Sequence, residues 1–415
     1  MGVSKSGGLP TADEKLIHDW NVFEAVPARP RRVELNDETL RDGMQSPSIT
    51  DPPLDVKVQA LHYMAELGIP HANIGMPCTS PKIQEATTEL AKTIAREKLP
   101  IRPNCAARTV PGDVQAIVDV SQAAGIPVEA AVFIGSSPIR ELAEGWDLDR
   151  MLRSTEEAIT FAVEHGLEVM YVTEDTTRAR PEVLQKLYRT AIDCGATRLC
   201  IADTVGHVTP HGARAIVRFF REEIVRDRPE LRIDWHGHND RGLAVANALA
   251  ALEAGADCVH GTILGIGERV GNTSLDQLLV NLVLLGWLDQ DLSALSKYCE
   301  LIHKHCGAPL PFNYPVVGRD AFRTSTGVHA AAIVKAQQKG DAFLANRVYS
   351  GVPAELVGRE QEIEIGPMSG KWNVIYWLRK HGQDPHPELV EKILAHAKSA
   401  DRVLREQEIY ELLAR

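Results

Sequence analysis

Residues 33–47, VELNDETLRDGMQSP, begin like a β-strand and end in a group of charged side chains. Asp37, Glu38, Arg41 and Asp42 lie within six residues of one another at the end of the strand-like run. Three carboxylates and a guanidinium are costly to bury without partners, so we expect them to face other polar groups. The prediction of the fold therefore depends on which residues lie at the ends of the other strands.

The pattern of an apolar run followed by a helical segment recurs about every 30 residues up to residue 290. Several of the helical segments end in glycine, and the alternation is typical of βαβ units. The predicted strands are VELNDET (33–39), HANIGMP (71–77), IRPNCAAR (101–108), VEAAVFIG (128–135), LEVMYVTED (167–175), TRLCIADT (197–204), RIDWHGHN (232–239) and CVHGTILGIG (258–267). Eight such strands match the count of a (β/α)8 TIM barrel, although a doubly wound open sheet shows the same alternation.

Polar residues gather at the carboxyl ends of nearly all of these strands, and this favours the barrel. Beyond the first strand they are Arg108, Ser136, Ser137, Glu174, Asp175, Asp203, Thr204, His236, His238, Asn239, Asp240, Glu268 and Arg269. In a TIM barrel the carboxyl ends of all strands form one face, on which active sites are built. The sequence therefore predicts an α/β fold, a (β/α)8 TIM barrel with one polar face.

Two further regions flank the predicted barrel of residues 31–290. Residues 1–30 contain three prolines and two adjacent glycines, and predict an N-terminal arm around one helix with a Thr11–Glu14 capping box. Residues 291–415 predict helical C-terminal subdomains, because helical segments there are joined by longer connections that contain proline and glycine.

Composition excludes several classes of protein. Hydrophobic residues at 44% and charged residues at 24% are typical of a soluble globular protein, and no stretch approaches the roughly 20 apolar residues of a membrane span. The net charge of −11 argues against nucleic acid as the main partner, because phosphate binding needs a basic surface. The N-terminal segment has no apolar core for a secretory signal, which predicts a cytoplasmic protein with reduced cysteines.

The stretch WHGHND, residues 235–240, supplies a pattern of metal ligands. His236 and His238 are two positions apart, so a strand directs both imidazoles to one face. With Asp42 from another strand end they would form a His-His-carboxylate set, which leaves open positions on a six-coordinate divalent metal. A lone strand histidine is more often structural, but the pair at a strand end favours a site for Mg, Mn, Zn or Co.

The charged residues of the first segment divide by position. Asp42 is the expected ligand because Asp37 and Glu38 fall within the strand and point to alternate sides of it. Arg41 is adjacent to Asp42, so its guanidinium can stabilise an oxyanion beside the metal without losing its proton. The alternative for Arg41 is a surface salt bridge. GIGERVGN (265–272) is glycine-rich but lacks the Lys-Ser/Thr pair of a phosphate loop.

Three segments carry a resemblance to a known family: LRDGMQ, HGHNDRGLAVANALAALEAGA and GIGERVGNTSLDQLL. They closely resemble motifs of the Claisen-condensing group of the metal-dependent TIM-barrel family, which comprises 2-isopropylmalate, homocitrate, citramalate and re-face citrate synthases. The resemblance runs from about residue 33 to 380. It implies an acyltransferase that condenses acetyl-CoA with a 2-oxo acid and then hydrolyses the thioester, with a divalent metal as cofactor.

The resemblance also implies roles for individual residues. The implied metal site consists of Asp42, His236 and His238, with Asn272 beside it. The implied catalytic residues are Arg41, Glu174 of YVTEDTTR and His329 of TGVHAAA. Thr204 of DTVG is the implied contact for the 2-oxo acid, and Arg140, Arg108 and Gln45 are further candidates for substrate binding. Glu174 and His329 form the expected acid/base pair, although outside the motif His329 would read as a structural helix histidine.

Departures from the family pattern bear on the substrate. Asn73 and Ala331 stand where the family usually has acidic residues. Arg140 stands where isopropylmalate synthases usually have histidine and where homocitrate synthases have an arginine for the distal carboxylate of 2-oxoglutarate. An arginine suits a second anionic group, which predicts 2-oxoglutarate, oxaloacetate or a phosphonate analogue. GNTSLDQLL is more similar to the isopropylmalate type, so 2-oxoisovalerate is the alternative.

Two other classes of function fit part of the sequence. A lyase of the hydroxymethylglutaryl-CoA lyase type shares RDG and His-x-His, but has a cysteine-bearing loop after its eighth strand where this chain has GIGERVGN. A non-catalytic binding protein is permitted by Asn73 and Ala331, but the intact ligand and acid/base residues oppose it. The family implies a homodimer, with residues 291–415 serving dimerisation and covering the active site, and the chain's length predicts no leucine-binding regulatory domain.

Overall fold

The computed structural model describes residues 16, 17, 21 and 30–414. The N-terminal arm predicted for residues 1–30 lies outside the described residues except at four positions, and Thr11 and Glu14 of its capping box lie outside them altogether. Among the described residues, no helix combines the length and the apolar character that crossing a membrane requires.

Eight parallel strands close into a barrel in sequence order, with β8 paired to β1. The strands are β1 (Glu34–Asp37), β2 (His71–Asn73), β3 (Arg102–Arg108), β4 (Glu129–Gly135), β5 (Val169–Glu174), β6 (Arg198–Asp203), β7 (Arg232–Gly237) and β8 (Cys258–Gly261). The prediction of a (β/α)8 TIM barrel is therefore confirmed, and the open sheet is excluded.

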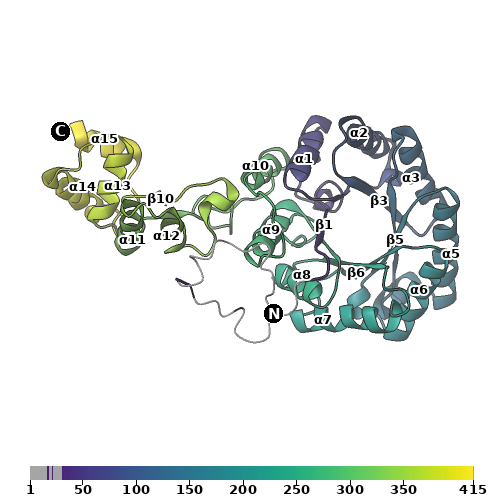
Figure 1. The fold of residues 1–415 in the computed structure, drawn as a ribbon. Helices are drawn as coiled ribbons and strands as arrows, with labels where there is room; N and C mark the ends of the chain where they lie inside the picture. The colour runs from purple at the N-terminus through teal and green to yellow at the C-terminus, as the bar shows by residue number, and fades with distance from the viewer. Residues whose placement is uncertain (1–15, 18–20, 22–29, 415) are drawn as a thin grey trace, which may run out of the picture. The chain divides into compact units, whose positions relative to one another are not determined.

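The helices surround the barrel on its outer side (Figure 1). They are α1 (Leu54–Glu66), α2 (Pro81–Glu97), α3 (Pro111–Ala124), α4 (Pro138–Glu144), α5 (Leu148–Glu164), α6 (Pro181–Asp193), α7 (Pro210–Phe219), α8 (Ala244–Glu253), α9 (Leu275–Leu284) and α10 (Leu295–Cys306). Five of these helices, α2, α3, α4, α6 and α7, begin with proline, whose fixed φ suits the first turn.

Several strands are shorter than predicted, and the difference lies at their carboxyl ends. The first strand ends at Asp37, because the next residues form a turn in which the Arg41 N–H donates to the Glu38 carbonyl (3.1 Å). The eighth ends at Gly261, because Leu264 takes a left-handed conformation (φ 58°) that no strand contains. The polar residues that follow each strand thus belong to loops at one face of the barrel.

Successive residues at the end of β1 take opposite directions. Asp37 Oδ2 accepts a hydrogen bond from the Tyr298 hydroxyl of α10 on the outer side (3.0 Å). Glu38 instead lines a cavity inside the barrel, together with His236 and His238 of the β7 end. Because side chains alternate along a strand, residues two positions apart share the interior.

The chain divides into two compact units. The first comprises residues 1–291 and 297–308 and contains the barrel, and the second comprises residues 292–296 and 309–415. The second unit contains β9 (Arg323–Thr324), α11 (Gly327–Gln338), α12 (Ala342–Arg347), β10 (Glu362–Ile363), α13 (Lys371–Lys380), α14 (Pro387–Ser399) and α15 (Glu406–Ala414). Its main core joins α13, α14 and α15 through residues such as Val374, Leu378, Ile393 and Ile409.

Candidate metal centre and active site

A cavity of about 140 Å³ lies at the carboxyl ends of the barrel strands. Its polar lining residues are Glu38, Arg41, Asp42, Gln45, Asn73, Glu174, Thr204, His236, His238, His260, Glu268 and Arg269. Its apolar lining residues are Met76, Ala106, Ala131, Phe133, Met170, Val172, Cys200 and Ala202. The structure thus brings together seven of the predicted site residues: Arg41, Asp42, Gln45, Glu174, Thr204, His236 and His238.

Asp42, His236 and His238 converge on one point at the edge of this cavity. Asp42 Oδ2 lies 3.2 Å from His236 Nε2 and 3.8 Å from His238 Nε2, and the two Nε2 atoms are 3.3 Å apart. All three residues are buried. The other carboxylate oxygen, Asp42 Oδ1, is buried without a hydrogen-bond partner among the described residues.

This donor set fits a divalent metal ion. Two imidazole nitrogens and one carboxylate oxygen directed at one another are ligand types shared by Zn, Mn and Co sites, and an orphaned buried oxygen is costly without a cation or a water. Burial, and then the neighbouring His236, lower the pKa of His238 to about 4. The His238 ring is therefore neutral at pH 7, which is the form that binds metals.

The backbone around β7 explains why both imidazoles can share one face. Gly237 separates the two histidines, and a Cβ atom there would lie 2.9 Å from Trp235 Nε1, so a larger residue would force the Trp235 side chain or the strand to shift. After the strand, His238 forms an isolated antiparallel bridge with Asn272. The Asn272 amide donates to the Ile266 carbonyl (3.1 Å), so the glycine-rich loop fixes the end of β7.

Arg41 lies between two carboxylates beside the metal ligands. It pairs with Glu38 through Nη2, and its Nη1 lies 3.3 Å from Asp42 Oδ2. The predicted alternative, a salt bridge to these residues, is thus present, but it is not a surface pair, since only 18% of the Arg41 side chain is exposed. Burial acts against the charge of Arg41, but Glu38 and Asp42 outweigh it and raise the pKa of the guanidinium.

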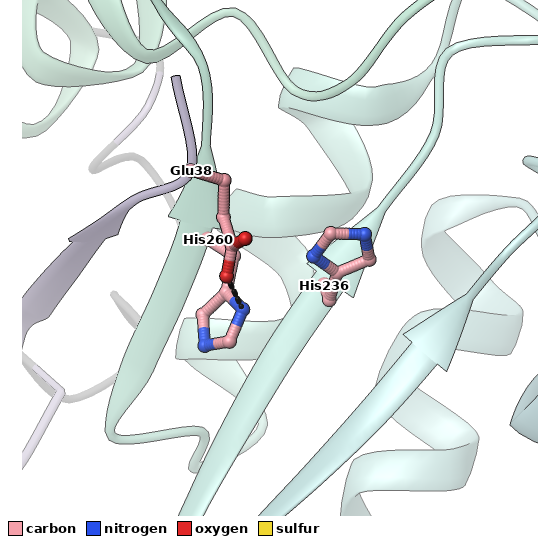
Figure 2. A group of neighbouring side chains, drawn as sticks. All are labelled: Glu38, His236 and His260. Carbon is pink, nitrogen blue, oxygen red and sulfur yellow. Dashed lines mark ion pairs between the residues drawn. The ribbon is translucent and has the colours of Figure 1, made fainter. Parts of the chain in front are cut away.

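The sequence did not single out two residues of this site, Glu38 as an interior residue and His260. Glu38 Oε1 lies 3.2 Å from His260 Nδ1, an ion pair that Figure 2 marks with a dashed line. His260 Nε2 lies 2.8 Å from Asp234 Oδ2. Glu38, His236 and His260 form a second group with the spacing of metal ligands, and Asp234, Cys258 and His260 form a third.

Glu174, at the end of β5, is the predicted acid/base residue that faces the cavity. Burial raises its pKa, and the nearby Arg140 opposes the shift. Arg140 Nη2 lies 3.3 Å from Glu174 Oε2 and 3.3 Å from Glu144 Oε1. Thr204 Oγ1 accepts a hydrogen bond from the Asp175 N–H (2.8 Å), so the ends of β5 and β6 are joined here.

Of the predicted site residues in the barrel unit, three are not among the described residues that line the cavity, namely Arg108, Arg140 and Asn272. Arg140 contacts the cavity residue Glu174, as above. Arg108 forms two hydrogen bonds to Asp113 on α3 (2.6 and 3.0 Å), and 62% of its side chain is exposed. The structure therefore pairs Arg108 with a neighbouring helix.

His329 belongs to the second unit, near the beginning of α11. Its ring stacks on Tyr349, with centroids 3.9 Å apart and an interplanar angle of 26°. Its part in the reaction stays a prediction.

Comparisons with known proteins show what this chain is similar to. The family model described as HMGL-like matches residues 32–302. The chain is 34% identical over 382 residues to homocitrate synthase AksA of Methanopyrus kandleri, covering 91% of this chain and 90% of that protein. It is 32% identical to a probable 2-isopropylmalate synthase of the same organism, covering 89% of this chain and 70% of that protein.

The fold is similar to that of a hydroxymethylglutaryl-CoA lyase from Pseudomonas aeruginosa. It superimposes with a TM-score of 0.55 at 20% identity, covering 66% of this chain and 93% of that one. At this identity the likeness establishes the fold alone.

Proposed function

Because the chain belongs to the HMGL-like family, and within it to the acetyl-CoA-dependent condensing synthases, we propose that the barrel cavity joins the methyl carbon of acetyl-CoA to the ketone carbon of a 2-oxo acid. The observation that carries this proposal is the convergence of Asp42, His236 and His238 within 3.8 Å of one another, with Arg41 beside them. The product is a 2-hydroxy-2-carboxymethyl acid, and free CoA leaves after hydrolysis of the thioester.

Asp42, His236 and His238 would hold the divalent metal. When bound, the cation supplies Lewis-acid chemistry, which polarises the ketone of the 2-oxo acid. Arg41 lies 3.3 Å from Asp42, so its guanidinium is placed to stabilise the negative charge that the ketone oxygen acquires as the carbon–carbon bond forms. Asn272 holds the loop beside His238 and would act on the site through that backbone bridge.

Proton transfer would be carried by Glu174 and His329. A base removes a proton from the acetyl methyl group, and an acid gives a proton to the alkoxide that forms at the former ketone. Burial raises the pKa of Glu174 toward the operating range, which suits an acid/base residue. We retain His329 as the second residue on the resemblance of TGVHAAA to the family motif.

For the 2-oxo acid we propose an anionic side chain, with Arg140 as its partner and Thr204 and Gln45 as further contacts. Arg140 already lies between Glu144 and Glu174, so a distal carboxylate would have to displace one of them. The relatives named homocitrate synthase support this choice. We also propose Arg108 as a substrate contact, a role that requires its ion pair with Asp113 to open.

A second candidate is condensation with 2-oxoisovalerate, as in a 2-isopropylmalate synthase. The observation that favours it is the apolar part of the cavity lining, which includes Phe133, Met170 and Val172. Apolar side chains would accept a branched alkyl group without leaving buried polar atoms unpaired.

The test is an assay for free thiol with acetyl-CoA, one of the four candidate metals, and a panel of 2-oxo acids. The panel contains pyruvate, 2-oxoisovalerate, oxaloacetate, 2-oxoglutarate and phosphonopyruvate. We expect CoA to be released from acetyl-CoA in the presence of one of these acids and of the metal, and His236→Ala to abolish that release. His62→Ala, which changes a partly exposed histidine on α1, is the matched control. If no acid of the panel causes release of CoA, or if His236→Ala leaves the release intact, the proposal is excluded.

We further propose a cytoplasmic homodimer in which residues 291–415 serve dimerisation and cover the active site. The resemblance to the synthase family supports this. Light scattering of the purified chain tests the dimer, and a monomer at micromolar concentration would contradict it.

A further inference from the structure

A row of buried charged side chains runs from the cavity into the barrel interior. Arg41 pairs with Glu38, Glu38 Oε1 lies 3.2 Å from His260 Nδ1, and His260 Nε2 lies 2.8 Å from Asp234 Oδ2. Arg198 of β6 completes the row, since its Nε donates to Asp234 Oδ1 (2.9 Å). Glu38, His260, Asp234 and Arg198 are each at most 3% exposed.

His260 occupies the centre of this row, and its geometry argues against a second metal ion. Figure 2 shows Glu38, His236 and His260 close together, and their spacing would suit metal ligands. However, both ring nitrogens of His260 are directed at carboxylate oxygens, so both act as N–H donors. A ring that donates from both nitrogens has no lone pair for a cation. The row then alternates in charge, which is how buried charges are stabilised.

Glu38 is the link between this row and the catalytic face. Besides His260, its Oε1 accepts from the Asn36 amide (2.7 Å), and Asn36 Oδ1 in turn accepts from the Asn104 amide (2.7 Å). Glu38 Oε1 is therefore held by two partners, His260 and Asn36, and Glu38 Oε2 is directed to Arg41. A long arginine side chain keeps a fixed orientation only if its partner is itself fixed.

We propose that Glu38, His260 and Asp234 are positioning residues that fix the Arg41 guanidinium beside Asp42. The role of Arg41 in the reaction rests on the function proposed above. Asp234 is not among the described cavity-lining residues, and it acts on Arg41 only through His260 and Glu38. Substitution of Asp234, which does not line the cavity, should therefore lower the rate of the chemical step.

The kinetic test is a two-by-two cycle of His260→Ala and Arg41→Gln. We expect His260→Ala to lower kcat at least 10-fold while the KM for acetyl-CoA changes less than 3-fold. In the Arg41→Gln background, His260→Ala should alter kcat less than 2-fold, because the guanidinium that His260 helps to position is then absent. Imidazole added to His260→Ala should restore part of kcat. Equal effects in both backgrounds would overturn the proposal.

A structural readout separates this proposal from the proposed function. In a crystal structure of His260→Ala we expect the Arg41 guanidinium to leave its position beside Asp42, whether or not any 2-oxo acid is turned over. An unchanged guanidinium would overturn the positioning role, whereas absence of thiol release by the wild type would overturn only the function. Metal content of two ions per wild-type chain, falling to one in His260→Ala, would also overturn the proposal in favour of a second metal site.

Two further variants cover the case in which His260→Ala does not fold. Asp234→Asn keeps the side-chain volume and one acceptor for His260, and we expect the same selective loss of kcat at smaller size, about 3-fold or more. Asp257→Asn is the matched control, because Asp257 is a buried carboxylate that pairs with Arg221 instead. We expect it to lower Tm without changing kcat. An equal loss of kcat in Asp234→Asn and Asp257→Asn would contradict the proposal.

Discussion

Two clusters of carboxylate and imidazole lie side by side in the barrel, and they differ in how completely they are paired. In the outer cluster, Asp42, His236 and His238 point at one another, and Asp42 Oδ1 is left without a hydrogen-bond partner among the described residues. In the inner cluster of Glu38, His260 and Asp234, both nitrogens of the histidine meet a carboxylate. The rings of His236 and His260 are only 5.5 Å apart. The difference fits the two proposals made above, that the outer cluster binds a metal ion and that the inner one positions Arg41.

The largest expected effect would come from the outer cluster. His238→Ala removes one of three proposed ligands, so we expect metal affinity to fall at least ~100-fold and thiol release to become undetectable. Because the deleted ring is poorly paired in the metal-free protein, its stability should change by less than ~1 kcal/mol. Calorimetric titration with the metal and urea unfolding of the metal-free protein measure the two quantities. Unchanged metal affinity would remove the contrast between the clusters.

The next effect would come from the inner cluster and appear in stability. His260→Ala leaves the buried carboxylates of Glu38 and Asp234 without their shared cation, so we expect the free energy of unfolding to fall by about 3 kcal/mol. Urea unfolding of the metal-free variant measures it, with His238→Ala as the comparison. Equal losses in the two variants would show that pairing does not distinguish the clusters.

A smaller effect should come from Asp37, the outward neighbour of Glu38. Burial raises the pKa of Glu38, but Arg41 and His260 outweigh it and bring that pKa to about 2. Asp37 is equally buried but is held by neutral partners, the Thr39 N–H and the Tyr298 hydroxyl, and burial raises its pKa to about 6. Adjacent carboxylates thus shift in opposite directions according to whether their partners are charged.

The pH dependence of stability follows from that shift. Because the pKa of Asp37 is higher in the folded chain than its usual value of 3.8, the folded state holds the proton more tightly. Its favourable contribution is complete below about pH 4 and is lost as the pH rises through 6. We expect Asp37→Asn to be about 1–2 kcal/mol more stable than wild type at pH 7 but not at pH 4, by urea unfolding.

Asp119→Asn, an exposed change on α3, is the control for this pH series. A stability difference between Asp37→Asn and wild type that stays constant from pH 4 to 7 would refute the assignment.

The smallest expected effect comes from Arg140, whose guanidinium forms ion pairs with both Glu144 and Glu174. If it meets the distal carboxylate of the substrate, Arg140→Ala should raise KM for dianionic 2-oxo acids about 10-fold and leave KM for 2-oxoisovalerate nearly unchanged. Steady-state kinetics on the panel measure this, with Arg180→Ala as a control at another helix start. Preference of the wild type for 2-oxoisovalerate would refute the anionic side chain.

The sequence predicted the barrel because strand alternation and polar strand ends are local patterns. It also placed the outer cluster, because His236 and His238 are two residues apart and Asp42 follows a strand end. The inner cluster could not be found in this way. His260 is a single histidine in an apolar strand, and its partners depend on the pairing of Asn36 with His260 across the β1–β8 closure.

One signal for the inner cluster was nevertheless present. Asp37 and Glu38 were expected on opposite sides of the first strand, which requires that one of them face the interior. Arg108 shows what a strand pattern leaves out. A strand-end arginine suggested substrate binding, and this stays a prediction, while a carboxylate five residues later, Asp113, accepts both of its hydrogen bonds in the structure. Competition from a nearby helix is not visible in a strand pattern.

The opposite directions of Asp37 and Glu38 also restrict how the gene can vary. A deletion or insertion of one codon within β1 would exchange the directions of the two carboxylates. Glu38, which pairs with His260 and Arg41, would then point outward toward Tyr298, and Asp37 would point into the barrel. The same event in the loop after residue 45 would leave both directions intact. We therefore expect descendants of this chain to accumulate length differences between the strands and helices, and almost none within β1 or β7.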